Sequence, residues 1–276
     1  MTTTRASETK PNGAYADVNG INLYYETHGE GRPVVVLHGG LGSGELFAPA
    51  LPALAGRYRV IVPDLQGHGR TADIDRPIDP RLMANDIAAL IGHLGLEKPA
   101  IVGYSLGGGV AFHTAVQHPE VVDSLVTIST NLRRSAIYPE MLAQQGQMSA
   151  AAIEFMKQTP MYESYQRIAP RPDDFGRLLD KIGQSMAEDF DFSDKVRGLK
   201  VPTLFACADA DMFPPSHAVE VFGLLGGGQR DGGWMGEGRP VGGHALAIVP
   251  GATHYDVFTS PVLTAAILAF LDAPEG

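Results

Sequence analysis

A serine flanked by glycines lies in the first half of the chain, in a pattern typical of an activated nucleophile. Residues 103–107, Gly-Tyr-Ser-Leu-Gly, match the pattern G-x-S-x-G with Ser105 at its centre. The β-branched segment AIV precedes this motif, and the segment GGVAFHTAV, of helical composition, follows it. A sharp turn from strand to helix would lift the Ser105 hydroxyl clear of the backbone, where it can attack a substrate. The sequence therefore predicts that Ser105 is a catalytic nucleophile.

A serine hydroxyl needs an imidazole to accept its proton, and the imidazole needs a carboxylate that holds its tautomer. We expect these residues in the order serine, acid, histidine. Among the histidines after residue 198, His217 lies in a predicted helix and His244 ends a glycine-rich segment. His254 instead directly follows the strand-like segment ALAIVPGAT. We therefore predict that His254 is the general base.

Two carboxylates follow the strand-like segment TLFACA, and one of them is expected to orient His254. Asp209 and Asp211 are separated by one residue, so their spacing does not distinguish them. The end of the preceding strand, where such an acid can also lie, holds Thr130 and Asn131 and therefore no carboxylate. We select Asp211 as the acid and expect Asp209 to accept hydrogen bonds from local backbone N–H groups in a turn.

Strand and helix segments alternate around these residues. An Asn-Gly pair at positions 19 and 20 predicts a hairpin near the start of the chain. The apolar run PVVVL predicts a strand buried on both faces, and helices and further strands follow it in turn. Strands that alternate with helices imply right-handed crossovers. We therefore expect an α/β fold with a doubly wound, mostly parallel, eight-stranded sheet.

This alternation stops between residues 131 and 198, where methionine, glutamine and aromatic residues occur at helical spacing. We interpret residues 131–198 as a small helical cap inserted after the sixth strand, and residues 1–130 and 199–276 as the core. Cap residues with large apolar side chains are expected to line a substrate pocket, although their spacing also suits plain packing. These residues are Met148, Met156, Met161, Tyr162, Tyr165 and Met186.

The composition limits the classes of partner. The chain has 276 residues, of which 44% are hydrophobic and 19% charged, as in a globular protein without a membrane span. Its net charge of −10 disfavours nucleic acid, whose phosphates require clustered lysine and arginine.

The polar start MTTTRASETKPNG contains no secretory signal, so a cytoplasmic location is expected. The sequence contains no common metal-binding or nucleotide-binding motif, so we expect neither a metal nor a cofactor.

Two features are expected to lie away from the catalytic residues. Cys207, the single cysteine, lies within TLFACA and is expected to be a buried, unreactive side chain. The glycine-rich segment 226–243 precedes the last strand, and loops from helix to strand lie opposite the catalytic edge of a parallel sheet. The sequence does not distinguish a monomer from a homo-oligomer.

Together these motifs resemble the α/β-hydrolase superfamily, in the branch with small carboxylesterases, cofactor-free perhydrolases of the haloperoxidase type and homoserine-lactone hydrolases. The resemblance extends from near Val18 to the last predicted helix. In relatives with a D-x-D pattern the second carboxylate usually acts, which supports Asp211. Besides the Ser105 motif, the resemblance rests on His38-Gly39-Gly40-Leu41, Asp64-Leu65-Gln66-Gly67-His68-Gly69, Asp209-Ala210-Asp211 and Pro250-Gly251-Ala252-Thr253-His254.

The resemblance also implies roles for residues near the nucleophile. It implies an oxyanion hole made by the backbone N–H groups of Gly40 and Leu106, with Leu41 as the alternative to Gly40. His38 and His68 are expected to brace the loops beside the nucleophile.

The reaction implied is hydrolysis of a small carboxylic ester, or of a lactone such as an acyl-homoserine lactone, through an acyl-enzyme on Ser105. Two alternatives would use the same three residues, namely hydrolysis of a carbon–carbon bond and perhydrolysis. A slow-turnover ligand receptor with this fold is a further alternative. Dehalogenases and epoxide hydrolases of the fold are disfavoured, because they would require an aspartate in place of Ser105. In each case the expected partner is a small molecule.

Overall fold

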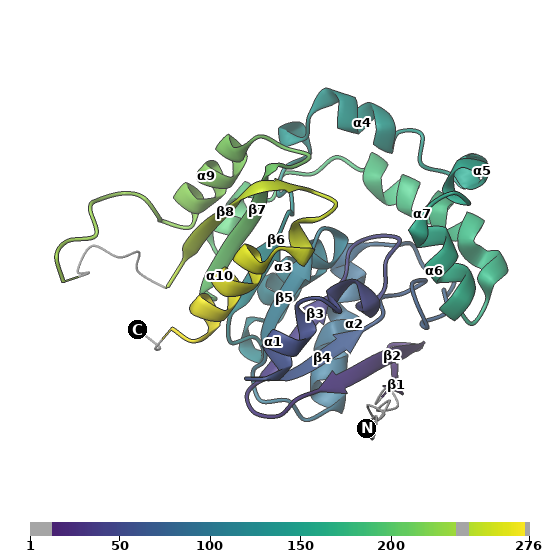
Figure 1. The fold of residues 1–276 in the computed structure, drawn as a ribbon, viewed down its shortest axis with the longest axis horizontal. Helices are drawn as coiled ribbons and strands as arrows, with labels where there is room; N and C mark the ends of the chain where they lie inside the picture. The colour runs from purple at the N-terminus through teal and green to yellow at the C-terminus, as the bar shows by residue number, and fades with distance from the viewer. Residues whose placement is uncertain (1–12, 236–242, 274–276) are drawn as a thin grey trace, which may run out of the picture.

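The structure is a computed structural model that describes residues 13–235 and 243–273. Within them, one sheet has the strand order β1-β2-β4-β3-β5-β6-β7-β8 (Figure 1). The first two strands are antiparallel to their neighbours, and the other pairs are parallel. The strands are β1 (Gly13–Val18), β2 (Ile21–His28), β3 (Pro33–Leu37), β4 (Arg59–Pro63), β5 (Ala100–Tyr104), β6 (Leu125–Ile128), β7 (Thr203–Ala210) and β8 (Ala245–Thr253). The prediction of a mostly parallel, eight-stranded sheet is confirmed.

The antiparallel start is a two-residue hairpin. Val18 pairs with Ile21 across the turn. Asn19 and Gly20 both have positive φ, 49° and 79°, as a type I′ turn requires. Asparagine and glycine adopt this backbone conformation at low cost, so this short sequence fixes the register of β1 against β2.

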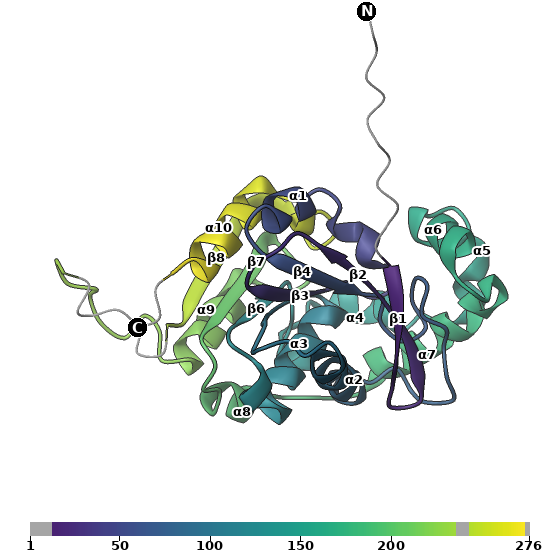
Figure 2. The same ribbon diagram turned by 90° about the horizontal axis from the view of Figure 1, so that it is seen from below.

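Helices cover both faces of the sheet (Figure 2). α1 (Leu51–Ala55) and α10 (Pro261–Leu271) lie on one face, and α2 (Pro80–His93), α3 (Leu106–Gln117) and α9 (Pro215–Leu224) lie on the other. This arrangement is the doubly wound layering that the alternation of strands and helices predicts. Within the described residues, none of the helices has the length and apolar composition needed to span a bilayer.

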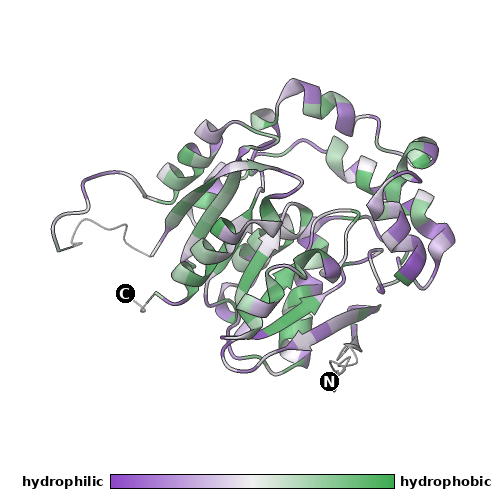
Figure 3. Cartoon of the chain, in the orientation of Figure 1, coloured by the Kyte–Doolittle hydropathy of each residue, from purple (hydrophilic) through white to green (hydrophobic). Residues whose placement is uncertain are grey.

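Each face of the sheet has its own apolar core. Along β3, Val34 and Val36 enter one core, and Val35 and Leu37 enter the other. A strand buried on both faces is a continuous apolar run rather than an alternating one. Figure 3 accordingly shows the central strands largely in green, the colour of hydrophobic residues.

Helices α4 to α8 lie between β6 and β7, within the segment that we call the cap, residues 131–198. Their bounds are α4 (Pro139–Gln145), α5 (Ile153–Met156), α6 (Pro160–Ile168), α7 (Phe175–Ala187) and α8 (Ser193–Arg197). Figure 1 shows α5, α6 and α7 grouped beyond one side of the sheet, with α4 above it. The last helix, α8, packs instead against α9 of the core.

The longest cap helix, α7, turns an apolar stripe inward. Phe175, Leu178, Leu179 and Ile182 are all buried, and their spacing places them on one helical face. A Cβ atom on Gly67, in the loop after β4, would lie 3.4 Å from Cδ1 of Leu178. α7 therefore packs directly on the loop that follows β4.

Candidate active site

Ser105 occupies a strained turn between β5 and α3. Its backbone φ of 52° and ψ of −117° are unfavourable for a residue other than glycine. The backbone around it is held by hydrogen bonds, from Ser105 N–H to Ile128 O at 2.9 Å and from Gly109 N–H to Ser105 O at 3.0 Å. The surrounding structure thus fixes the serine in the geometry predicted for an exposed nucleophile.

Two glycines make this turn possible because neighbouring backbone passes very close to them. A Cβ atom on Gly103 would lie 2.2 Å from the carbonyl oxygen of Gly107. A Cβ atom on Gly107 would in turn lie 2.3 Å from the carbonyl oxygen of Leu37, at the end of β3. Any larger side chain at either position would displace backbone, so the G-x-S-x-G pattern follows from packing.

The structure brings Ser105, His254 and Asp211 together at the ends of β5, β8 and β7. Nε2 of His254 lies 3.1 Å from Oγ of Ser105. Nδ1 of His254 lies 2.8 Å from Oδ1 of Asp211. A proton on Nδ1 is donated to the carboxylate, which leaves Nε2 as an acceptor for the serine proton. This arrangement can deprotonate the hydroxyl as it attacks.

The carboxylate of Asp211 is buried and fully engaged. It accepts hydrogen bonds from the Ser129 hydroxyl, from Ala208 N–H at 3.1 Å and from Met212 N–H at 2.8 Å, in addition to His254. Burial alone would raise the pKa of Asp211, but the bonds from His254, Ser129 and Met212 outweigh it and lower that pKa. The carboxylate therefore stays ionised and can stabilise an imidazolium on His254.

The carboxylate of Asp209 binds backbone N–H groups of β8. It accepts hydrogen bonds from Gly251 N–H at 2.9 Å and from Ala252 N–H at 3.2 Å. The expectation of local N–H partners is wrong, because these groups lie on β8, on the strand next to β7. The β7–β8 register is irregular between Ala208 and Ala210, so the side chain of Asp209 bonds N–H groups beside this irregularity. Asp209 thereby supports the segment that leads to His254.

Two residues that we did not select from the sequence also hold these groups in place. Ser129, which binds Asp211, directly follows β6 and has a positive φ of 51°. The Tyr104 hydroxyl donates to the carbonyl oxygen of His254 at 2.6 Å, and the two rings are 5.4 Å apart. Their positions at the ends of β6 and β5 were a usable signal, because those strand ends share one edge with the nucleophile.

The residues selected for the oxyanion hole lie beside the nucleophile. Gly40 and Leu41 follow β3, and Leu106 is the first residue of α3. The first N–H groups of a helix have no partner within the helix, so the N–H of Leu106 is free of the α3 ladder. A Cβ atom on Gly40 would lie 3.9 Å from Cβ of Leu106, so these two residues are close neighbours.

His38 and His68 bond the loops around the site. His38 donates from Nδ1 to Gly39 O at 2.8 Å and accepts at Nε2 from Leu65 N–H at 3.0 Å. Nδ1 of His68 donates to Gln66 O at 2.7 Å. His38 thus links the loop after β3 to the loop after β4.

The six residues selected for a substrate pocket take different positions. Met156 and Tyr165 are buried within the apolar core that the cap, through α7, shares with one face of the sheet. Tyr162 and Tyr165 each pack edge-on against Phe175 at 5.1 Å, whereas Met161 is exposed. Met148 and Met186 are partly buried against the same core.

The cap residue beside Gly40 is instead Ile182 of α7. Its Cδ1 would lie 3.8 Å from a Cβ atom on Gly40. Reasoning from methionine and aromatic content missed this residue. The signal that could have found it is the apolar periodicity of α7, whose inward stripe ends at Ile182.

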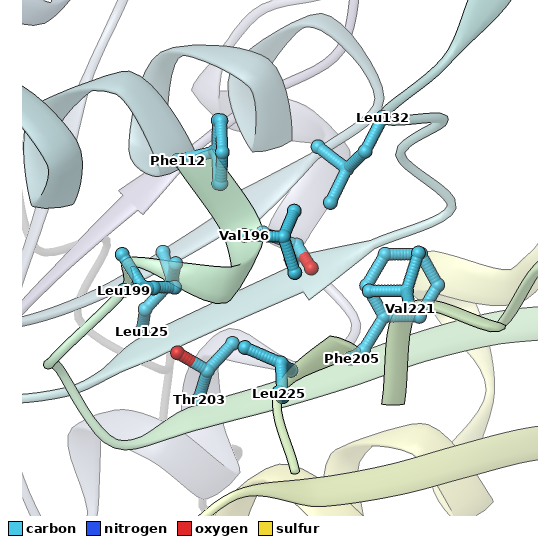
Figure 4. A pocket seen from close by; sticks show the side chains of 10 residues that line it. Phe112, Leu125, Leu132, Val196, Leu199, Thr203, Phe205, Val221 and Leu225 are labelled. Atoms are coloured by element: carbon cyan, nitrogen blue, oxygen red, sulfur yellow. The ribbon is translucent and has the colours of Figure 1, made fainter. Parts of the chain in front are cut away.

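A small apolar void lies inside the core, away from these groups (Figure 4). Its volume is about 10 Å³, and its lining includes Phe112, Val196, Phe205 and Val221, contributed by α3, α8, β7 and α9. A void of this size and character is at the lower limit for one water molecule. It is a packing gap rather than a place for a substrate.

The remaining sequence-based expectations concern features outside the site. Cys207 is fully buried in β7, and burial raises the pKa of its thiol. Residues 1–12 and 236–242, which include the polar start and the middle of the glycine-rich segment, lie outside the described residues. Gly243 leads into the end of β8 opposite His254. Across residues 13–235 and 243–273, no group of three or more acidic, histidine or cysteine side chains could hold a metal ion.

Buried histidines make the folding stability depend on pH. Burial lowers the pKa of His38 and of His113 to about 4, and that of His68 to about 3. The unfolded chain binds these protons near pH 6.5 and the folded chain does not, so this stability is complete above pH 6.5 and is lost as the pH falls toward 4. Burial also raises the pKa of Asp64 to about 6, which acts in the opposite direction over part of this range.

We therefore expect the free energy of unfolding to fall by roughly a few kcal/mol for each unit that the pH drops near pH 5. These three histidines, joined by His217 and His244, whose pKa burial also lowers, outweigh the single aspartate. Urea unfolding between pH 5 and pH 8 measures this slope. His113→Leu should reduce the slope by roughly 1 kcal/mol per pH unit, because it removes one titrating group. An unchanged slope in this variant would show that the pH dependence arises elsewhere.

Comparisons with known proteins identify the family of this chain. Residues 32–185 match the family model described as the alpha/beta hydrolase fold. Over 113 residues the chain is 40% identical to a soluble epoxide hydrolase from Corynebacterium sp. strain C12, a match that covers 40% of this chain and 38% of that protein. Over 127 residues it is 39% identical to a pimeloyl-[acyl-carrier protein] methyl ester esterase from Chromobacterium violaceum, covering 45% of this chain and 48% of the esterase.

A solved structure extends the similarity over nearly the whole fold. A thermophilic esterase from Thermogutta terrifontis superposes with a TM-score of 0.71 at 23% identity, over 95% of this chain and 98% of the esterase. The family model alone covers more than half of the chain, from the loop before β3 to α7. This chain therefore belongs to the α/β-hydrolase-fold family, and it spans less than half the length of the epoxide hydrolase and of the methyl ester esterase that it matches.

Proposed function

We propose that this hydrolase cleaves small carboxylic esters through an acyl-enzyme on Ser105. The observation that carries the proposal is the continuous contact from Ser105 Oγ through His254 to Asp211, at 3.1 Å and 2.8 Å. A serine with this support attacks acyl carbons, because the imidazole removes its proton and the carboxylate stabilises the resulting cation.

The first half of the reaction forms the acyl-enzyme. Oγ of Ser105 bonds to the ester carbonyl carbon while Nε2 of His254 takes the hydroxyl proton. The carbonyl oxygen becomes an oxyanion, which accepts hydrogen bonds from the N–H groups of Gly40 and Leu106. The tetrahedral intermediate then collapses, the bond to the alcohol oxygen breaks, and His254 gives its proton to the departing alcohol.

The second half releases the acid. A water molecule attacks the acyl carbon and transfers a proton to Nε2 of His254. The bond between the carbon and Oγ breaks, Ser105 regains its proton from His254, and the carboxylic acid leaves. A lactone follows the same steps, except that the alcohol stays attached to the product. No step requires a cofactor.

An esterase activity also accounts for the residue at position 105. Part of the chain resembles a protein named as a soluble epoxide hydrolase. The epoxide hydrolases of this fold, as the resemblance implies, use an aspartate as nucleophile, whereas this chain has Ser105. Similarity to a methyl ester esterase over residues that cover 45% of the chain favours ester chemistry at this serine.

Hydrolysis of p-nitrophenyl esters from acetate to decanoate tests the proposal, with a homoserine lactone measured in parallel. We expect repeated turnover that is absent from the Ser105→Ala variant. Labelling of the protein once, without further product, would instead support a ligand receptor. Inactivity toward every ester and lactone would favour hydrolysis of a carbon–carbon bond by the same residues.

A further inference from the structure

The loop between β4 and α2 contacts both walls of the candidate active site. We call its residues 64–76 the anchor loop. On one side, Leu65 N–H donates to His38 at 3.0 Å, which ties the anchor loop to the segment with Gly40. On the other side, Leu178 of α7 packs at Gly67 of the anchor loop. The anchor loop therefore links the segment with Gly40 to α7.

Lys181 of α7 is the main polar link between the cap and the anchor loop. Its Nζ donates to Asp73 Oδ2 at 2.6 Å, to Ile74 O at 2.7 Å and to Arg76 O at 2.8 Å. An ammonium group has three protons, so this set satisfies all of them. Only 13% of the Lys181 side chain and 2% of the Asp73 side chain are exposed. A buried pair with complete hydrogen bonding fixes geometry more strongly than a surface pair.

Neighbouring groups complete the Asp73 site. Arg177, one turn before Lys181 on α7, reaches Asp73 Oδ2 with Nε at 3.0 Å. Gln66 donates to Asp73 Oδ1 at 2.9 Å, and Arg171 donates to the backbone carbonyl of Asp73. Three cationic side chains of the cap thus converge on one aspartate of the anchor loop.

The residue next to Lys181 in the sequence lies beside Gly40, which we assign to the oxyanion hole. Ile182 is 3% exposed, and its Cδ1 and the side chain of Leu106 both lie within 4 Å of the Cβ position of Gly40. The leaving oxygen of a substrate must lie near His254 to receive its proton. An acyl chain that points away from His254, past Gly40, would meet the side chains of Ile182 and Leu106.

We propose that Ile182 limits the length of the acyl group and that Lys181, bound to Asp73, holds Ile182 in that position. The inference rests on the proposed ester hydrolysis, because it needs an acyl group beside Gly40. Ile182 is then a specificity-determining residue, and Lys181 is a positioning residue that acts through α7. The enzyme accordingly prefers short acyl chains.

The test compares kcat/KM for p-nitrophenyl acetate and p-nitrophenyl hexanoate. In Ile182→Ala the ratio of hexanoate to acetate should rise about tenfold or more, because the missing carbon atoms make room for further methylenes. In Lys181→Met, which removes the charge and keeps most of the side-chain length, the ratio should rise in the same direction by a smaller factor. Lys181→Arg should keep most of the wild-type ratio.

Lys157→Met is the matched control, because Lys157 is a cap lysine paired at 2.7 Å with Glu154 in a solvent-exposed position. It should leave the ratio unchanged. A series of acetates with lengthening alcohols should also respond equally in all variants. Thermal unfolding verifies that each variant is folded. Ile182→Ala tests whether Ile182 limits the acyl length even where Lys181→Met does not fold.

The outcomes separate the two proposals. Wild-type protein without Ser105-dependent ester turnover would refute the proposed function itself. Active variants with the wild-type ratio of hexanoate to acetate, or a change confined to the alcohol series, would refute the role of Ile182 in limiting acyl length. Ester hydrolysis as the proposed function would remain. A higher ratio in Ile182→Ala but not in folded Lys181→Met would refute the positioning role of Lys181.

Discussion

Replacing Ser105 with alanine is expected to lower kcat for ester hydrolysis by roughly 10⁵-fold to 10⁶-fold. The variant keeps His254 and Asp211 but has no atom that can form the acyl-enzyme. The strained backbone at position 105 is equally unfavourable for serine and alanine, so we expect little change in stability. Initial rates with p-nitrophenyl acetate, together with thermal unfolding, measure both quantities.

Ser124→Ala is a suitable control for this prediction. Ser124 directly precedes β6, and its hydroxyl bonds Asp123 at the end of the strand opposite the site. The control should keep wild-type activity. If Ser105→Ala retained activity within about tenfold of wild type, with the fold unchanged, Ser105 would not be the nucleophile.

Asp211→Asn is expected to lower kcat by roughly 10³-fold to 10⁴-fold. An amide can donate to Nδ1 of His254 and so favour the wrong tautomer, and it cannot stabilise the imidazolium. The backbone N–H of Ala208, which lies 3.1 Å from Oδ2 of Asp211, would also lose its charged acceptor. The rate of p-nitrophenyl acetate hydrolysis measures the loss.

The same substitution at Asp209 gives the comparison. Asp209 accepts from the backbone N–H groups of Gly251 and Ala252 with different oxygens, so an asparagine with its one oxygen keeps one of the two bonds. We expect Asp209→Asn to lower the rate by about tenfold or less, through a slightly less rigid His254 segment. Equal or larger damage at Asp209 would move the role of the acid from Asp211 to Asp209.

Much of the fold follows from local sequence. The Asn-Gly turn, the apolar run of β3 and the glycines around Ser105 each have a short-range physical cause, so the order of strands and helices can be predicted. Ser105, Asp211 and His254 were selected because each follows a predicted parallel strand. Those strands end at one edge of the sheet, where the structure places the three side chains within hydrogen-bonding distance.

Other contacts depend on packing between distant segments. The partners of Asp209 lie more than 40 residues away, beside an irregular register between β7 and β8 that no local pattern specifies. Ser129 reaches Asp211 only because β6 and β7 are neighbours in the sheet. Sequence spacing does not encode either contact.

The cap residues show most clearly that contacts between distant segments cannot be predicted from the sequence. Methionine and aromatic content drew attention to Met156 and Tyr165, which pack inside the cap. The side chain beside Gly40 is the aliphatic Ile182, and its position follows from how α7 docks on the anchor loop. Side-chain type alone could not predict this docking, because the bonds of Lys181 to residues 73–76 cross more than 100 positions of sequence.

The most direct test of the central claim is covalent labelling with an alkyl phosphonate that bears a good leaving group. We expect one phosphonyl group per chain, located at Ser105 by peptide mass spectrometry, and no labelling of Ser105→Ala. Labelling should also be much slower in Asp211→Asn, because activation of the serine needs the intact His254 contact. Stoichiometric labelling of Ser105→Ala, or a label at another residue of the wild-type protein, would contradict the proposed acyl-enzyme.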